Sequence, residues 1–203
     1  MLVDDRVAHA LLVAAAVLVV AGELLASYIG QTRDGRRVFG RSRDGAVRQD
    51  RGTKLVFALS AYLAIGVAIA IAKSPALRGG ADTWWTLGLG LAIALAGAGF
   101  RDWSIVSLGR YFRREVTIEP GQTIVRRGPY RWLRHPSYTG LALMIAGFGL
   151  AIGSWLGAAA ALGIVVAGLL PRIRVEEAAL AQTFGAEYTA YASSTSRLVP
   201  HVW

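Results

Sequence analysis

The sequence predicts an all-α integral membrane protein with five transmembrane helices, the last two of which form a helical hairpin. The first observation is composition, because 54% of the 203 residues are hydrophobic, more than a soluble domain of this size carries. The second is that the apolar residues fall into runs long enough to cross the roughly 30 Å hydrocarbon core of a bilayer. The third is that basic residues gather in alternate loops. Residues 1–203 are therefore expected to form a single membrane domain.

Residues 7–29 form the first predicted crossing, and only Glu23 interrupts this apolar run. An intramembrane carboxylate can mark a functional site. Near the end of a span it more often reaches polar groups, and we favour that interpretation. A cleaved signal peptide is the alternative, and the net acidic sequence Asp4-Asp5-Arg6 argues against it, because a signal peptide begins with a basic segment.

The middle of the chain alternates basic loops with apolar spans. Residues 31–54 form a basic loop that we expect to lie against anionic lipid headgroups. Residues 55–72 and 83–100 are the second and third crossings, and Trp84-Trp85 is typical of an interfacial aromatic anchor. Residues 101–134 form a second basic segment with short β-prone runs broken by turn residues, so we expect irregular, partly extended structure there.

The uncharged stretch 137–171 predicts the hairpin. A single helix of its 35 residues would be about 50 Å long, far more than a bilayer core. The stretch must therefore turn back, and Gly153-Ser154 near its middle is the natural bend. This gives two helices of about sixteen residues each, 137–153 and 155–171. Both ends of such a hairpin return to the same side of the membrane.

The distribution of basic residues predicts the orientation. If the first crossing runs from outside to inside, all of the 22 lysines and arginines except Arg6, Lys73 and Arg78 lie on the inner side. We therefore expect the N-terminus outside and residues 172–203 in the cytoplasm. The composition, rich in alanine, glycine and arginine, suggests the plasma membrane of a bacterium.

The cytoplasmic segment is expected to contain an amphipathic helix. An apolar and aromatic stripe at helical spacing follows the hairpin, and Gly185 interrupts it. We expect this helix to lie over the site or along the membrane, and the stripe to serve packing. Its residues are Leu180, Phe184, Tyr188 and Tyr191.

Composition excludes several kinds of chemistry. The chain has no cysteine, which rules out disulfides, thiolate catalysis and thiolate metal sites. Its three histidines lie at positions 9, 135 and 201, too far apart for a local metal cluster, so we expect no metal. The net charge of +9 could suggest nucleic acid, but its placement on one side of the membrane points to lipid headgroups instead.

Two polar clusters flank the hairpin and should meet at its open end. Pro136 suits the first turn of a helix, so Arg134 and His135 lie at a helix N-terminus that favours an anionic group. At the other end, Arg172 and Glu176 share one helix face. Singly, these residues fit a helix cap or a surface ion pair. Together they can grip a zwitterionic cofactor and position an anionic substrate, so we expect a cytoplasmic cofactor site in the C-terminal half.

At these residues the sequence resembles the isoprenylcysteine carboxyl methyltransferase family. The resemblance rests on residues 128–140, on Arg172 with Glu176-Glu177, on 184–188 with Tyr191, and on 197–200. It implies S-adenosylmethionine as cofactor and a membrane-associated acceptor, the carboxylate of an isoprenylcysteine-like or other lipophilic acid. Arg172 matches the substrate-side catalytic arginine. The implied cofactor-binding residues are Gln122, Thr123, Ile124, Val125, Tyr130, His135, Pro136, Ser137, Tyr138 and Glu176, with Gln122 replacing a histidine of many relatives.

Three other functions stay open on the sequence. Sterol-type reductases, which use NADPH, carry a similar Arg-His-Pro motif. A phospholipid or amine methyltransferase would act on an ammonium group, which Arg172 would repel, so the arginine favours a carboxylate acceptor. A lipid-binding scaffold would use only the basic segments and would not depend on His135 or Glu176.

Overall fold

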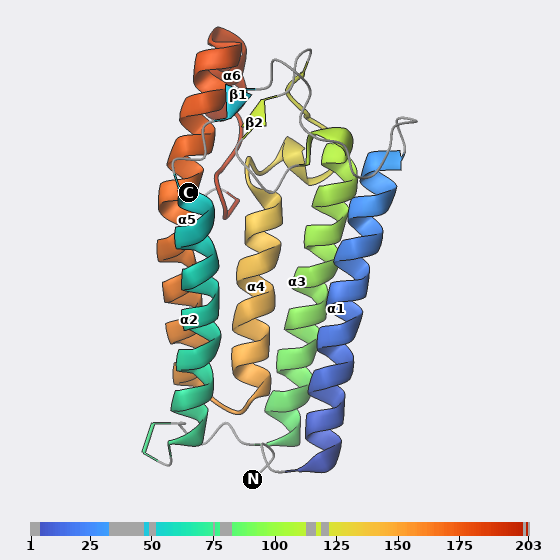
Figure 1. Cartoon of the computed structure of the whole chain (residues 1–203), viewed down its shortest axis with the longest axis vertical. Helices are drawn as coiled ribbons and strands as arrows, with labels where there is room; N and C mark the ends of the chain where they lie inside the picture. The colour runs from blue at the N-terminus through green and yellow to red at the C-terminus, as the bar shows by residue number, and fades with distance from the viewer. Residues whose placement is uncertain are drawn as a thin grey trace.

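The protein is a bundle of long helices with a short helix folded back at one end (Figure 1). The computed structural model describes residues 5–32, 47–48, 52–74, 76–77, 83–112, 117–118, 122–200 and 202. The helices are α1 (Arg6–Thr32), α2 (Thr53–Lys73), α3 (Trp84–Leu108), α4 (Pro136–Ala151), α5 (Trp155–Phe184) and α6 (Ala186–Ser193), with the 3₁₀ turns η2 (Gly109–Tyr111) and η3 (Gly128–Arg131). The two-residue strands β1 (Val47–Arg48) and β2 (Thr117–Ile118) pair antiparallel.

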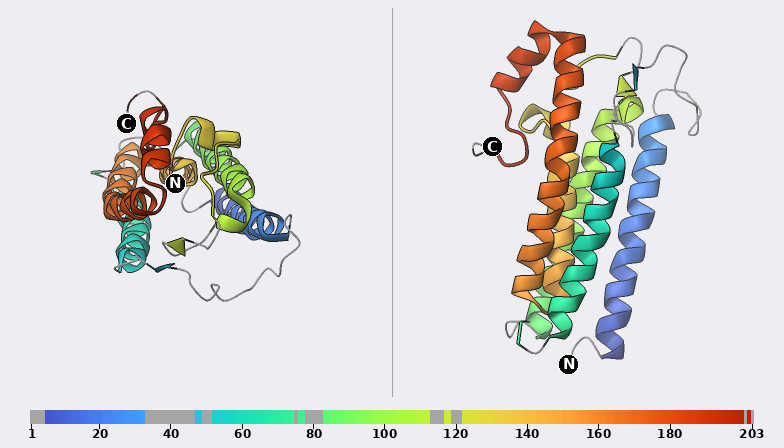
Figure 2. Two further views of the ribbon diagram at one scale, coloured as in Figure 1. Left: turned by 90° about the horizontal axis from the view of Figure 1, so that it is seen from above. Right: turned by 60° about the vertical axis from the view of Figure 1, so that its left-hand side comes forward.

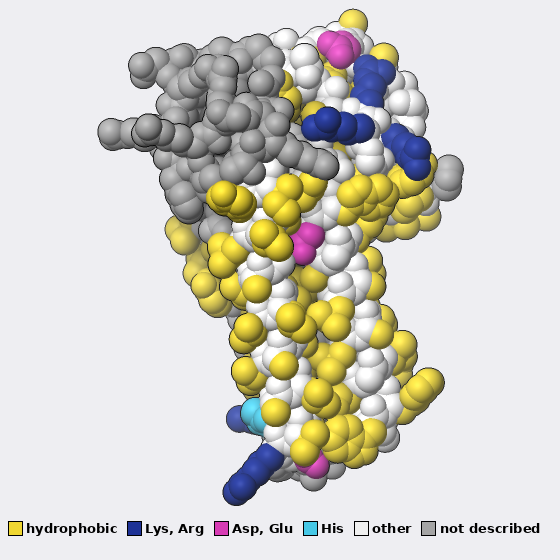
Figure 3. All heavy atoms as spheres, turned by 90° about the vertical axis from the view of Figure 1, so that its right-hand side faces the viewer, with side chains coloured by type: hydrophobic (Ala, Val, Ile, Leu, Met, Phe, Trp, Pro, Cys, Tyr) yellow, Lys and Arg dark blue, Asp and Glu magenta, His cyan; other side chains and the backbone are white. Residues whose placement is uncertain are grey.

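Four of these helices, α1, α2, α3 and α5, are long and apolar enough to cross a membrane. Helix α4 is shorter, at 16 residues, but is equally apolar in sequence. Large apolar side chains stand exposed along the outer helices, for example Val17 and Leu18 on α1. Figure 3 shows apolar side chains over most of the length of this face, with lysine and arginine near its ends. Such a surface is stable in lipid and not in water.

The hairpin turns at the bend that the sequence predicts. Helix α4 ends at Ala151, and Gly153 adopts a positive φ of 90°, which a residue with a side chain rarely tolerates. Ser154 then caps α5, because its side chain accepts a hydrogen bond of 2.9 Å from the backbone N–H of Gly157. The two helices pack against each other. The start of α4 and the C-terminal part of α5 therefore lie at the same end of the bundle (Figure 1).

The second helix of the hairpin continues well beyond the predicted membrane span 155–171. Helix α5 has 30 residues and runs through Pro171 to Phe184, so Arg172 and Glu176 share one helix as the sequence predicts. Proline cannot donate the helical hydrogen bond to residue 167 and normally breaks a helix. Here Leu169 and Ile173 on either side of it are buried in the bundle core, and this packing stabilises the helical path. Arg172 and Glu176 therefore stand on a rigid helix.

Helix α3 also extends farther than expected. It ends at Leu108, so the segment 101–134 begins with two helical turns and is not irregular throughout. No glycine or proline occurs in these turns before Gly109, and Ser104 and Ile105 are fully buried. This extension places Arg101 and Asp102 inside the bundle instead of in a loop.

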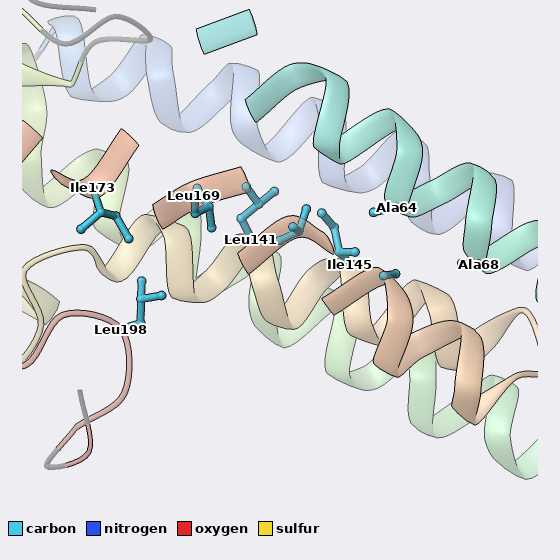
Figure 4. Packing of buried hydrophobic residues seen from close by; sticks show 9 residues of the cluster. Ala64, Ala68, Leu141, Ile145, Leu169, Ile173 and Leu198 are labelled. Carbon is cyan, nitrogen blue, oxygen red and sulfur yellow. The ribbon is translucent and has the colours of Figure 1, made fainter. Parts of the chain in front are cut away.

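The helices follow one another around a curved row in the order α2, α5, α4, α3, α1 (Figure 2). The core between α2, α4 and α5 consists of small and branched apolar side chains (Figure 4). Its buried members are Ala64, Ala68, Leu141, Ile145, Ala161, Val165, Leu169, Ile173 and Leu198. Because α1 and α2 are the two ends of the row, the concave side of the bundle lies between them.

The C-terminal segment folds back onto the start of α4. The backbone N–H of Arg134 donates to the Ser196 carbonyl at 2.8 Å, and that of His135 donates to the Arg197 carbonyl at 3.1 Å. The Thr139 hydroxyl donates to the Leu198 carbonyl at 2.7 Å. Backbone groups that would be unsatisfied before the helix are thus paired, which fixes the segment containing His135.

Candidate active site

A cavity of about 640 Å³ occupies the concave side of the bundle, at the end where the hairpin opens. Its wall includes residues from α1, α2, α3, α4, α5 and α6 and from the segment before α4. The expected site residues that line it are Gln122, Thr123, Ile124, Val125, Tyr130, His135, Ser137, Tyr138, Arg172 and Glu176. Pro136 is fully buried and does not line the cavity, in keeping with a role in starting α4.

Three side chains form a hydrogen-bonded chain in the wall. The Arg172 Nε–H donates to the Tyr138 hydroxyl at 2.6 Å, and that hydroxyl donates to Glu176 Oε1 at 2.9 Å. Arg172 Nη2 lies 4.0 Å from the same carboxylate oxygen. The Arg172 side chain is only 4% exposed. A buried guanidinium fixed in this way presents a cation of defined position to the cavity.

His135 lies between two carboxylates. Its ring stacks on Tyr138 with centroids 5.6 Å apart, and its Nδ1 and Nε2 atoms lie 3.4 Å from Glu176 Oε2 and from Glu177 Oε1 respectively. Burial alone would lower the pKa of His135, but the two carboxylates outweigh it and raise that pKa above its usual value. The ring therefore keeps its proton to higher pH than a free histidine does.

Glu177 organises the structure behind the site. Its carboxylate accepts hydrogen bonds from Arg134 Nε at 2.9 Å and from Arg197 Nε at 3.0 Å, and Arg197 Nη2 lies 2.9 Å from Oε2. Arg134 also donates to the carbonyls of Ala192 and Thr195. Glu177 thus joins α5, the start of α4 and the C-terminal segment. It does not line the cavity, so Glu176 faces the cavity while its neighbour serves the scaffold.

Two residues of the opposite wall were not expected to belong to the site. Arg101 Nη2 donates to Glu23 Oε1 at 3.1 Å, and Arg101 Nη1 donates to the Ser137 carbonyl at 3.1 Å. Both side chains line the cavity. The sequence interpretation assigned Glu23 to nearby polar groups and placed Arg101 in a basic loop. The sequence did contain a signal for these two residues. Glu23 is a carboxylate within one predicted span, and Arg101 directly follows another.

The apolar and aromatic stripe of the C-terminal segment forms part of the cavity wall. Leu180, Phe184, Tyr188 and Tyr191 all line it, so the stripe contributes to the site as well as to packing. Helix α5 ends at Phe184 and α6 begins after Gly185, whose φ is 52°. The Tyr191 hydroxyl donates to the Tyr130 carbonyl at 2.8 Å. Burial raises the pKa of Tyr191 to about 12, so this hydroxyl stays neutral.

The arrangement suits a ligand with both charges and an apolar part. Glu176, His135 and Arg172 offer a carboxylate, an imidazole and a guanidinium, and Tyr130 and Tyr138 add aromatic faces. Apolar residues of α1 and α2, among them Leu24 and Phe57, also line the cavity. Within the described ranges no group of three histidine, aspartate or glutamate side chains could hold a metal ion.

Several known proteins are similar to this chain. The model of the isoprenylcysteine carboxyl methyltransferase (ICMT) family matches residues 89–182. Protein-S-isoprenylcysteine O-methyltransferase A of Arabidopsis thaliana is 34% identical over 121 residues, which are 59% of this chain and 61% of that protein. The Saccharomyces cerevisiae Protein-S-isoprenylcysteine O-methyltransferase is 29% identical over 116 residues, 56% of this chain and 48% of that protein. The chain thus spans about half to three fifths of the length of these relatives.

A solved structure supports the same fold. The structure of a eukaryotic intramembrane Ras methyltransferase ICMT (isoprenylcysteine carboxyl methyltransferase) is similar with a TM-score of 0.63 and 24% sequence identity. The likeness covers 89% of this chain and 61% of that chain. The segment that the family model matches, residues 89–182, contains Arg101, His135, Arg172 and Glu176. It leaves out α1 and α6. The chain is thus similar to the isoprenylcysteine carboxyl methyltransferase family in the sequence of residues 89–182, and it shares the fold of the solved structure.

Proposed function

We propose that this protein transfers a methyl group from S-adenosylmethionine to the carboxylate of an isoprenylcysteine-like or other lipophilic acid within the membrane. The observation that carries the proposal is the Arg172–Tyr138–Glu176 chain beside His135, in a cavity that both charged and apolar side chains line. The names of the curated relatives support the same reaction.

The residues of the cavity fit this cofactor. Glu176 would accept the cofactor's ammonium group, and His135, at the start of α4, would favour its carboxylate. Tyr138 and Tyr130 would contact the sulfonium or the base, and Gln122 to Val125 would line the side. Gln122 keeps an amide able to donate and accept hydrogen bonds in place of a histidine. The cavity volume lies within the usual range for small-molecule sites.

The protein's part in the reaction is to position the acceptor. When bound, S-adenosylmethionine supplies an electrophilic methyl group on a positively charged sulfur. The carboxylate oxygen would take this methyl group as its carbon–sulfur bond breaks, so the acceptor carboxylate and the sulfonium sulfur would both lose their charge. The acceptor is already ionised at neutral pH, so no general base is needed. Arg172 would orient it, and the aromatic wall of α5 and α6 would exclude water.

We further propose how the chain sits in the membrane. Helix α4 would be the fourth of five crossings, because it packs between α3 and α5 along the same axis. The N-terminus would be outside and the hairpin's open end in the cytoplasm, here the inside of a bacterial plasma membrane. The cofactor would then enter from the aqueous end. The lipid tail would enter from the bilayer between α1 and α2, which both line the cavity.

Binding calorimetry on the detergent-purified protein tests the cofactor assignment. We expect S-adenosylhomocysteine, the demethylated product, to bind saturably and NADPH not to bind. Glu176→Ala should abolish the binding, because it removes the carboxylate for the ammonium group. Glu187→Ala is the matched control, since Glu187 is an exposed glutamate with only a long ion pair of 3.9 Å to Arg126. Binding of NADPH alone would instead indicate a reductase, and binding of neither ligand a lipid-binding scaffold.

A further inference from the structure

The ion pair between Glu23 and Arg101 forms part of the cavity wall. Glu23 comes from α1 and Arg101 from α3, and both side chains line the cavity. We propose that Glu23 selects the methyl acceptor by accepting a hydrogen bond from an N–H group next to the acceptor's carboxylate. The inference rests on the proposed function and assigns a role to a residue outside the segment that the family model matches.

Arg101 fixes the position of Glu23 relative to the reacting end. One terminal nitrogen of its guanidinium donates to Glu23 and the other to the Ser137 carbonyl, both at 3.1 Å. Ser137 belongs to the first turn of α4, and the next residue, Tyr138, holds Arg172 and Glu176. The carboxylate of Glu23 is therefore joined through Arg101 to the turn that positions the proposed substrate arginine.

The packing of α1 also fixes this carboxylate. Gly22 contacts Asp102 of α3 so closely that a Cβ atom on it would lie 2.7 Å from the Asp102 carboxylate. The neighbouring Glu23 is thereby held at the α1–α3 contact while its side chain lines the cavity. The side chains of Glu23 and Arg101 remain 26% and 14% exposed and line the cavity, so a ligand there can reach them.

Glu23 has capacity for a ligand. Arg101 engages Oε1, and within the described residues no hydrogen bond reaches Oε2. A carboxylate can only accept hydrogen bonds, so its ligand partner must be a donor. Charged groups in membrane spans are costly and commonly serve function.

The neighbours of Glu23 identify what else the ligand contains. Val20 and Leu24 on α1 and Phe57 and Ala61 on α2 line the cavity beside it, and a lipid tail fits against them. Arg172 is the proposed partner of the carboxylate, and Arg101 joins Glu23 to the turn that holds Arg172. An acceptor that contacts Arg172, Glu23 and these apolar side chains together carries its N–H close to the carboxylate. An S-alkylated, N-acylated cysteine has this order of groups.

The test compares two acids that share the tail and the carboxylate. N-acetyl-S-farnesylcysteine has the N–H, and 3-(farnesylthio)propanoic acid has hydrogen in place of the acetamido group. The wild type should have the higher kcat/KM with the first acid. Glu23→Met should lower the ratio of kcat/KM for the first acid to kcat/KM for the second by about tenfold or more, because a charge-assisted hydrogen bond is lost. The main cause should be a higher KM for the first acid. The ratio does not depend on the fraction of folded enzyme.

Further variants keep the test decisive. If Glu23→Met does not fold, Glu23→Gln retains a side-chain oxygen for Arg101, and it should lower the ratio to a smaller extent. Glu187→Gln should leave the ratio as in the wild type, because Glu187 lies on the surface. S-farnesylcysteine, with an ammonium group, shows whether amide or ammonium N–H is preferred. An unchanged ratio in Glu23→Met or Glu23→Gln, or no wild-type preference for the N–H acid, would overturn the inference.

The two proposals fail in different ways. Methylation of both acids with a ratio that ignores Glu23 would leave the methyltransferase assignment intact and remove only the selecting role. If the wild type methylates neither acid and does not bind S-adenosylhomocysteine, the proposed function fails together with the inference.

Discussion

At the residue scale, one tyrosine hydroxyl links the two charged groups of the candidate site. Tyr138 accepts from Arg172 and donates to Glu176, so the directions of both hydrogen bonds are fixed. His135 stacks on the same ring and lies beside the same carboxylate. Removing one member leaves the others buried without their partner, which costs more than the net value of one hydrogen bond.

We predict that Arg172→Ala lowers kcat/KM for a lipophilic acid by about 100-fold or more, because the acceptor carboxylate loses its positioning cation. Glu176→Ala should abolish methylation through loss of the cofactor. The control is Arg174→Ala, since Arg174 lies on the same helix but is exposed. Radiolabelled methyl transfer measures activity, and gel filtration in detergent checks the fold. Full activity in Arg172→Ala or Glu176→Ala would contradict the site assignment.

At the element scale, the contact between α3 and α4 depends on glycine. A Cβ atom on Gly97 would lie 2.6 Å from the backbone nitrogen of Met144 and 2.7 Å from the Gly140 carbonyl oxygen. The two helices are thus in backbone contact, which small residues make possible in membranes. Because α4 starts with His135 and carries Tyr138, the spacing of this helix pair decides where the site residues lie.

We predict that Gly97→Ala destabilises the protein by about 1–3 kcal/mol, since the added methyl group has no space at the helix contact. Gly99→Ala, two residues along the same helix, is the matched control. A Cβ atom there meets nothing within 4 Å, and alanine favours the helix, so its melting temperature should be equal or higher. Thermal unfolding in detergent compares the two. Equal melting temperatures would show that α3 and α4 are less tightly packed than described.

At the scale of the whole molecule, the lack of cysteine allows a direct test of membrane topology. Single cysteines at Ala76, in the turn before α3, and at Ser193, at the end of α6, are both exposed. Three helices separate them, so we predict that a membrane-impermeant maleimide labels Ala76→Cys from outside and Ser193→Cys only from the cytoplasmic side.

Right-side-out and inverted vesicles give the two orientations for this labelling. Reagent access to both cysteines from one side would mean that α4 does not cross the membrane. The opposite pattern, with Ser193→Cys labelled from outside, would contradict the proposed orientation. In that case the cofactor site would face away from the cytoplasm, and the methyltransferase proposal would lose its cofactor supply.

The sequence by itself determined the helical membrane class, the bend of the hairpin and the grouping of His135 with Glu176. These features follow from run length, from turn residues and from the return of a hairpin, which are properties of one continuous stretch. It ended α3 too early and did not find the end of α5 at Phe184, because where a helix ends depends on how the neighbouring residues are buried.

Only the tertiary structure decided which distant groups meet. Glu23 and Arg101 are 78 residues apart and pair because of how α1 and α3 are rotated against each other. Arg197 reaches Glu177 because the C-terminal segment returns to the start of α4. Helix rotation and chain return depend on packing across the whole bundle, which no local pattern encodes. For this reason the sequence alone predicted that His135 and Glu176 meet, whereas the tertiary structure was needed to show that Glu23 and Arg101 line the same cavity.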